Sequence, residues 1–549
     1  SEERVRIYLT NTLEPASDAD PQLTFAELAP ALAHEAQAVN AVKRGQCFTV
    51  IVGNPPYAGH SANKGPWIAG LLRGADAQGK PVENYFEVDG HSLNERNPKY
   101  LNDDYVKFIR FAQWRINQTG AGILSFITNH GHLDNPTFCG MRQSLLAQFR
   151  EIYVLDLHGS TKRRETTGDD TADENVFDIL PGVSIMLALT RSTSSSVASR
   201  VFHADLRGRR EHKYKRLIGS TFDTTSWERC NPRSPQYLFV ARDASLHGEY
   251  LRGWDITAIF PVSSNGFKTH RDHFAIAFSE REMQKRVQVL VAPEMSDAVV
   301  AAQYSLVETA DWPIGATRRN LRASKNWHHR LVQCLYRPFD TRYCLYGHHL
   351  MDRPRESDMS HVLLPNICIA TGRQGQAVGG DVWNLVTAGH VVADTNLFYR
   401  GGIQYFPLYL YPDRTSSRLF DDVSASPWSP DSAHGNRVPN LSQSFVTQLA
   451  SKLDLRFTTP SNYGNAIVLN PESIFHYVYA LLHSPTYRTR YADFLKIDFP
   501  RVPLTSELAL FRALIDLGAD LVGLHLMEDD YPAASWTKAG SVSPLQHPI

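Results

Sequence analysis

Residues 50–57 read VIVGNPPY, a short apolar run followed by a polar and proline-rich turn. The β-branched residues predict a buried strand that ends at Gly53. Pro55 and Pro56 fix the backbone just beyond the carboxyl end of that strand. In open α/β sheets, ligands bind outside the carboxyl ends of the strands. We therefore expect Asn54 and Tyr57 to face a ligand, and a plain tight turn after a strand is the alternative interpretation.

The flanking segments alternate between strand and helix patterns. Apolar residues at helical spacing predict helices over residues 25–43, 102–119 and 136–149. Apolar runs predict strands over residues 5–9, 123–128, 152–157 and 183–189. This order is typical of a doubly wound sheet. The fold class we expect is α/β: a partial doubly wound, Rossmann-like sheet, then a mixed α+β domain and a helical C-terminal region.

The length of the chain and the changes in amino-acid composition along it indicate several domains. A chain of 549 residues accommodates about three domains. A Ser-rich stretch ends the first part, and a loop rich in Ser, Pro and Asp precedes the last helices. We expect a catalytic domain, a basic connector, a recognition domain and a helical region over residues 1–199, 200–245, 246–460 and 461–549, respectively.

The composition restricts the class of protein. The chain is 42% hydrophobic with a net charge of −1, so any nucleic-acid site must be a local basic surface. Its six cysteines form no CxxC pair and no zinc-ligand spacing, which favours a reducing cytoplasm and no structural metal. No run of about 18 apolar residues is present, so we expect a cytoplasmic protein without a membrane span.

Basic residues gather in two segments, residues 162–164 and 200–216. Such clusters contact DNA phosphates, although a short charge run is more often solvated surface. Arg and Gln also form bidentate contacts with guanine and adenine edges. The residues that we nominate for DNA contact are Lys162, Arg163, Arg164, Arg207, Arg209, Arg210, Arg373 and Gln374. The alternative for the last pair is an ordinary mixed fold.

Several segments together resemble one family. In the first part they are residues 8–15 (YLTNTLEP), 53–63 (GNPPYAGHSAN), 103–115 (DDYVKFIRFAQWR), 126–141 (FITNHGHLDNPTFCGM) and 155–159 (LDLHG). Later they are residues 336–342 (YRPFDTR), 406–411 (FPLYLY), 479–491 (YALLHSPTYRTRY) and 498–503 (DFPRVP). The chain resembles Type ISP restriction–modification enzymes, over the second part of their methyltransferase domain and their target-recognition and C-terminal parts.

The resemblance implies an enzyme that transfers a methyl group from S-adenosylmethionine to adenine N6 in a specific site of double-stranded DNA. Asn54, Pro55, Pro56 and Tyr57 match the catalytic Asn-Pro-Pro-Tyr motif of that class. The flipped base would donate its amino hydrogens to Asn54 and Pro55. Tyr57 would stack on one face of the base and Phe177 would pack on or beside it. A core Phe is the alternative for Phe177.

One departure from the family concerns the cofactor. The family grips S-adenosylmethionine with a Gly-rich turn, and Gly45 is the only glycine before residue 50. We therefore expect that motif upstream, in a methyltransferase, helicase and nuclease portion of the same polypeptide or in a split subunit. Asn11 is a candidate contact to the cofactor adenine. The alternative functions are a non-catalytic DNA-recognition subunit and, because the motif also occurs there, an RNA or protein methyltransferase.

Overall fold

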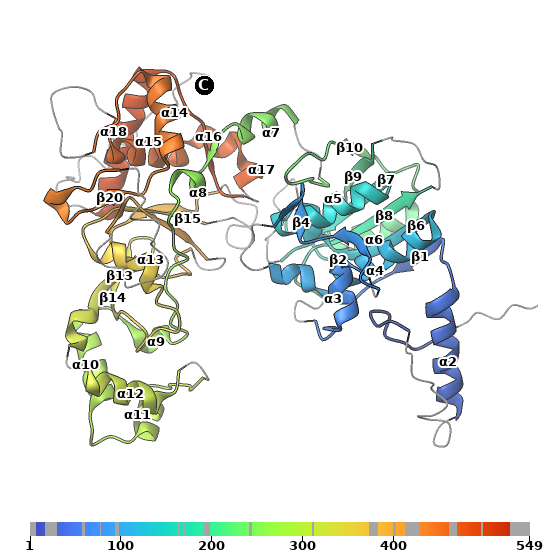
Figure 1. The fold of residues 1–549 in the computed structure, drawn as a ribbon, viewed down its shortest axis with the longest axis horizontal. Helices are drawn as coiled ribbons and strands as arrows, with labels where there is room; N and C mark the ends of the chain where they lie inside the picture. Colours follow the sequence, from blue (N-terminus) through green and yellow to red (C-terminus); the bar gives the residue numbers. More distant parts are fainter. Residues whose placement is uncertain are drawn as a thin grey trace, which may run out of the picture. The chain divides into compact units, whose positions relative to one another are not determined.

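The computed structural model divides into two compact units, residues 1–244 and 245–549 (Figure 1). It describes residues 7–16, 30–57, 61–76, 78–93, 98–161, 165–167, 171–191, 198–240, 244–309, 312–324, 326–372, 383–398, 402–411, 428–459, 469–495 and 498–527. None of the helices in this part of the chain combines the length and apolar character needed to cross a membrane.

A mixed sheet of six strands, in the order β1-β6-β8-β7-β9-β10, forms the centre of the first unit. The strands are β1 (Val50–Gly53), β6 (Gly122–Asn129), β7 (Glu151–His158), β8 (Val183–Thr190), β9 (Arg200–Asp205) and β10 (Glu228–Cys230). Strands β1, β6, β7 and β9 run in one direction, while β8 and β10 are antiparallel to their neighbours. The three predicted strands after β1 are therefore confirmed.

Strand β8 runs antiparallel to both of its neighbours, so the sheet is not purely parallel. A parallel return needs a crossover of a dozen or more residues, usually a helix. No helix lies between β7 and β8 in the residues that the structure describes there. The chain therefore turns back at the carboxyl edge, and β8 enters between β6 and β7 in the opposite direction, with Val183 opposite both Asn129 and His158.

Helices cover both faces of this sheet. Helices α4 (Asp104–Thr119) and α5 (Cys139–Gln148) pack against one face, where Ile109 and Leu145 join a core with Leu124. Helix α6 (Arg210–Gly219) packs against the other face through Leu217. Helix α2 (Pro30–Gly45) precedes β1. Helix α4 ends at Gly120, whose φ of 78° is readily adopted by glycine.

The prediction that β1 is buried was wrong. Ile51 packs against the core, but Val50 and Val52 are 54% and 71% exposed. The reason is that alternate side chains of a strand project from opposite faces of the sheet, so Val50 and Val52 lie on the face opposite Ile51, where no described element covers them. In addition, β1 pairs only with β6 among the described residues. The predicted strand over residues 5–9 is also absent from its described part: residues 7–9 have no regular structure, and Ile7 and Leu9 are exposed.

Short elements complete the first unit. They are α3 (Pro66–Leu72), β2 (Arg73–Ala75), β3 (Pro81–Asn84), β4 (Glu87–Val88), β5 (His91–Ser92), η1 (Pro98–Asn102), η2 (His130–Leu133) and η3 (Pro136–Phe138). The strands among them form two small hairpins, β2-β3 and β4-β5. The hairpin β4-β5 lies so close to α5 that a Cβ on Gly140 would approach the Glu87 carbonyl oxygen to 2.2 Å.

The described residues of the second unit form four small sheets. A four-stranded sheet holds β12 (Ile276–Ala277), β14 (Asp340–Leu345), β13 (Leu331–Arg337) and β17 (Val392–Ala393) in that order. A three-stranded sheet holds β16 (Val386–Gly389), β15 (Cys368–Thr371) and β18 (Gln404–Pro407). Two pairs remain: β11 (Trp254–Asp255) with β21 (Arg501–Val502), and β19 (Tyr409–Leu410) with β20 (Val438–Pro439).

Helices surround these sheets. The earlier ones are α7 (Ala244–Leu251), α8 (Ile256–Ile259), α9 (Asp272–Ala275), α10 (Glu280–Val291), α11 (Asp297–Gln303), α12 (Ile314–Ala323), η4 (Trp327–Arg330), α13 (Glu356–Met359), η5 (Ser360–Leu363) and η8 (Ser432–His434). The C-terminal ones are α14 (Gln443–Leu453), α15 (Pro471–His483), α16 (Pro485–Arg490), α17 (Ala492–Leu495) and α18 (Leu508–Leu526). Asn470 and Ser473 form the capping box that opens α15.

Candidate functional site

The Asn-Pro-Pro-Tyr motif follows β1 at the carboxyl edge of the first sheet. Asn54 is exposed, Pro55 is buried and Tyr57 is half-buried. The Tyr57 hydroxyl lies 3.1 Å from Asn54 Oδ1 and 3.2 Å from the Ile127 carbonyl oxygen, so it can donate its proton to either. Burial raises the pKa of Tyr57 to about 12, which keeps the phenol protonated near neutral pH. The turn is thus held to the neighbouring strand β6.

A polar cluster lies beside the motif. Asp104 Oδ1 accepts hydrogen bonds from Ser61 Oγ at 2.5 Å and Asn63 Nδ2 at 3.0 Å. Lys107 Nζ donates to Ser61 Oγ at 2.7 Å. Asn11 Nδ2 donates to Asn63 Oδ1 at 3.0 Å, which links the turn that contains Asn11 to the loop after the motif. The structure therefore brings Asn11 to Asn63, in the segment that follows the motif.

A second cluster, of histidines and carboxylates, lies at the same edge of the sheet. Asp156 lies in β7, two residues before the strand ends at His158, and its side chain is 3.1 Å from His130 Nδ1. His158 Nε2 is 2.6 Å from Asp205 Oδ1. His130, Asp156 and His158 offer ligand atoms within 4.8 Å of one another, the spacing of a metal site, and in this structure each imidazole is paired with a carboxylate.

The neighbouring carboxylates keep the His158 imidazole protonated. Burial alone lowers its pKa, but the carboxylates of Asp156, Asp205 and Glu165 outweigh that effect and raise the pKa to about 9. Burial alone would raise the pKa of Asp156, and the surrounding histidines instead hold it far below its usual range. His158 is therefore a buried cation among carboxylates at neutral pH.

Phe177 lies in the loop between β7 and β8, so it is at the same edge of the sheet as the motif. Phe177 is half-buried and packs against the cluster of Leu157, Val176 and Val183 on the α6 face. The Phe177 amide donates to Asn175 Oδ1 at 2.9 Å. Tyr57 packs on the opposite face, edge to face with Tyr105, with ring centroids 6.4 Å apart.

The basic residues nominated for DNA contact have different surroundings. Arg209 is exposed at the start of α6, and exposed Arg207 donates to the Thr166 carbonyl at 3.2 Å. Arg210 instead donates to backbone carbonyls and to Asp178. Lys162, Arg163, Arg164, Arg373 and Gln374 lie outside the described residues. DNA contact therefore stays a prediction for this set.

Sequence reasoning did not identify the histidine–carboxylate cluster. Its signal was present: Asp156, His158 and His130 are polar residues directly at the ends of apolar strands. Sequence reasoning also counted Lys213 with the surface charges, whereas Lys213 is fully buried and pairs with Asp173 at 2.8 Å. The pattern of charges on a helix does not reveal which of them is buried.

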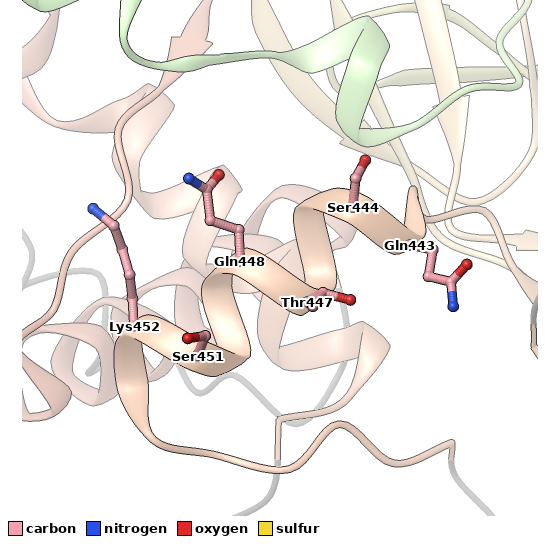
Figure 2. Close-up of a pocket in the computed structure, with 6 residues that line it drawn as sticks. All are labelled: Gln443, Ser444, Thr447, Gln448, Ser451 and Lys452. Atoms are coloured by element: carbon pink, nitrogen blue, oxygen red, sulfur yellow. The ribbon is translucent and has the colours of Figure 1, made fainter.

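A surface hollow in the second unit lies along α14 (Figure 2). Its lining residues come from one face of that helix, while Phe445, Val446 and Leu449 on the other face are buried. The lining residues, all polar, are Gln443, Ser444, Thr447, Gln448, Ser451 and Lys452. They include no acid and no nucleophile with a paired base, so we give the hollow no catalytic role.

Solved structures share this fold. The Type ISP restriction–modification enzyme LlaBIII bound to DNA has 22% identity and a TM-score of 0.62, over 91% of this chain and 31% of that chain. The DrdV–DNA complex has 22% identity and a TM-score of 0.63, over 93% and 47%. A nuclease-deletion mutant of the Type ISP enzyme LlaGI with a DNA substrate mimic has 20% identity and a TM-score of 0.61, over 91% and 43%.

The chain thus spans less than half the length of each of these relatives. A search of curated proteins gives no match. The model of one protein family, the Type ISP C-terminal specificity domain, matches residues 258–546, more than half of the chain. This chain therefore belongs to the family of the Type ISP C-terminal specificity domain.

Proposed function

We propose that this chain carries the base-holding part of an adenine-N6 DNA methyltransferase together with its target-recognition domain, as part of a Type ISP restriction–modification enzyme. The observation that carries the proposal is the Asn54–Tyr57 turn at the carboxyl end of β1, tied through the Tyr57 hydroxyl to Asn54 and to β6. The membership of residues 258–546 in a specificity-domain family supports the recognition part.

The residues of the turn account for the chemistry. An adenine that has left the duplex donates its two amino hydrogens to Asn54 Oδ1 and the Pro55 carbonyl, which raises the electron density at N6. An amide oxygen has two lone pairs, so Asn54 Oδ1 can also accept from Tyr57. Pro56 holds the turn rigid. Tyr57 and Phe177 contact the base, and catalysis consists of positioning and electrostatic stabilisation.

The methyl donor in this proposal is S-adenosylmethionine, which supplies the electrophilic methyl group. The residues present fit it only in part. Asn11 lies near the motif loop, but its amide group is already bonded to Glu14 and Asn63. The sequence before β1 contains no Gly-rich turn. We therefore assign most of the cofactor site to another part of the enzyme and assign Asn11 at most a peripheral contact.

The outer edge of β1 supports a partner for the first unit. An exposed apolar edge strand is a template for pairing with another strand. Val52 is 71% exposed on that strand. We propose that the rest of the methyltransferase domain, from the same polypeptide or a separate subunit, adds strands there. Double-stranded DNA is the other partner.

A second candidate function is DNA recognition without catalysis. The incomplete cofactor site favours it. It predicts sequence-selective footprints by the chain without S-adenosylmethionine, with an affinity that falls steeply with salt. A chain that gives no footprint with or without cofactor, yet methylates DNA when combined with the rest of the domain, would exclude this candidate.

The decisive experiment combines the chain with the rest of the methyltransferase domain and follows transfer of labelled methyl groups to plasmid DNA. The wild type is expected to produce N6-methyladenine, identified by mass spectrometry of the nucleosides. Asn54→Ala is expected to lose about 100-fold or more in rate, the effect of removing one preorganised hydrogen-bonding group.

Asn117→Ala is the matched control, because Asn117 is exposed on α4. It should retain the wild-type rate. Retained activity in Asn54→Ala would exclude the proposed role of Asn54. Preferential labelling of competing RNA or protein would instead place the chain among methyltransferases of another substrate class.

A further inference from the structure

Three side chains of α6 bind the backbone of the segment that carries Phe177. Arg210, Lys213 and Tyr214 are spaced i, i+3 and i+4, so they lie on one face of the helix. We call these three residues the carbonyl clamp and residues 173–178 the Phe177 segment. All four carbonyl oxygens of residues 174–177 accept a hydrogen bond from the clamp.

Lys213 is the buried centre of the clamp. Its Nζ donates to the carbonyl oxygens of Glu174 and Leu157, each at 2.6 Å, and to Asp173 Oδ2 at 2.8 Å. Both side chains of the Lys213–Asp173 pair are fully buried. This cation therefore ties the Phe177 segment to the carboxyl end of β7, where Leu157 lies.

Arg210 and Tyr214 hold the next three carbonyls. Arg210 donates from Nε to the Asn175 carbonyl at 2.7 Å and from Nη2 to the Phe177 carbonyl at 3.1 Å. The Tyr214 hydroxyl donates to the Val176 carbonyl at 2.5 Å. Because each peptide plane of the run is bonded to a side chain, none can rotate without breaking a hydrogen bond.

The segment is also held from the other side. Asn175 Nδ2 donates to the Gly159 carbonyl at 3.1 Å and to the Pro181 carbonyl at 2.7 Å. Gly159 has a φ of 82°, and a Cβ there would lie 2.4 Å from Asn175 Cα. The backbone around Phe177 is therefore fixed on both sides, while its ring is half-buried.

We propose that Arg210, Lys213 and Tyr214 are positioning residues that present the Phe177 ring at a preset place for the target base. This inference rests on the proposed function. Because the Phe177 segment is already ordered before the base binds, base binding does not have to offset the entropy cost of ordering it. Part of the positive charge of α6 thus serves the Phe177 backbone.

The first test needs no catalysis. Hydrogen–deuterium exchange of the Phe177 segment is measured in the full chain for Tyr214→Phe and Arg210→Lys, which remove clamp hydrogen bonds conservatively. Exchange is expected to become about fivefold faster for each net hydrogen bond lost. Lys215→Met, which changes an exposed cation of the same helix, is expected to leave it unchanged. Unchanged exchange in both clamp variants overturns the inference.

The second test uses the combined methyltransferase. Tyr214→Phe is expected to lower kcat by about tenfold, a cost within the range for small misplacement of a positioned group. KM for DNA stays the same, and the variant has no further effect in a Phe177→Ala background. An equal loss in that background, or an unchanged kcat, overturns the inference. A wild type that transfers no methyl group would disprove the proposed function, and the exchange test would still decide whether the clamp holds the segment.

Discussion

His158 lies between three carboxylates, each from a different part of the first unit. Its Nε2 is 2.6 Å from Asp205 Oδ1, and its Nδ1 is 3.6 Å from Asp156 Oδ2 and 3.5 Å from Glu165 Oε1. At the scale of one residue, the three carboxylates stabilise the protonated form of the His158 imidazole. The strand ends at the site edge are thereby joined by charge as well as by hydrogen bonds.

The stability of the first unit should depend on the protonation of His158. Its pKa is about 9 in the fold, against an ordinary value of 6.5. A raised pKa gives stability that is complete below pH 6.5 and is lost as the pH rises to about 9, by roughly 3 kcal/mol. The titratable and charged groups facing His158 are Asp156, Glu165, Asp205, Arg207 and His130.

The measurement is the free energy of urea unfolding between pH 6 and 9.5 for the wild type and His158→Gln. The difference between the two proteins should be largest at pH 6 and shrink toward pH 9. Because the facing carboxylates are ionised in the wild type across this range, the pH dependence of the difference reports on the titration of His158. A difference that is independent of pH would contradict the charged state of His158.

At the scale of elements, α15 and α18 of the second unit pack at very short range. A Cβ on Gly518 of α18 would lie 2.0 Å from the His476 carbonyl oxygen of α15. Backbone at that distance cannot move aside without separating the helices. Gly518 is therefore required for the crossing of the two helices, although glycine lowers the intrinsic helix propensity.

Gly518→Ala should destabilise the second unit by about 2 kcal/mol, the usual cost of overpacking a core. Gly248→Ala is the matched control, because Gly248 lies in α7 with open space around its Cβ position. The control should be neutral or stabilising by up to about 1 kcal/mol. Thermal unfolding of both variants checks this; equal midpoints would contradict the close helix contact.

At the scale of the whole molecule, each unit has a buried core of its own. The second unit has a large buried core that joins α14, α15 and α18 to its sheets. In the first unit, the edge strand β1 exposes Val50 and Val52. The exposed side chains and free edge of β1 make assembly with further strands testable.

Val52→Lys should weaken the association of the chain with the rest of the methyltransferase domain by at least about tenfold, since an unpaired Lys would be buried in the new contact. Val307→Lys is the control: Val307 is 77% exposed in the second unit. Affinities measured by calorimetry check the prediction. Equal affinities for Val52→Lys and the wild type would show that the β1 edge is not the contact.

Local patterns in the sequence were sufficient for much of the fold. The alternation of apolar runs and helical spacing predicted β6, α4, α5, β7 and β8, because each pattern reflects which face of one element is buried. Helix α15 begins at Pro471 with Asn470 as its N-cap, and both residue types are typical of a helix start. The placement of Asn54 just beyond a strand likewise followed from the adjacent residues alone.

Only the tertiary structure decided which elements are neighbours and which charges are buried. Strand β8 is antiparallel because the chain returns directly at the carboxyl edge, and β1 is exposed because no described element covers the face from which Val50 and Val52 project. Lys213 and Arg210 bind the backbone, and His158 bears its charge among carboxylates from distant segments. The burial and the pKa of a side chain depend on the residues that folding brings next to it. The spacing of residues along the sequence does not show which residues those are.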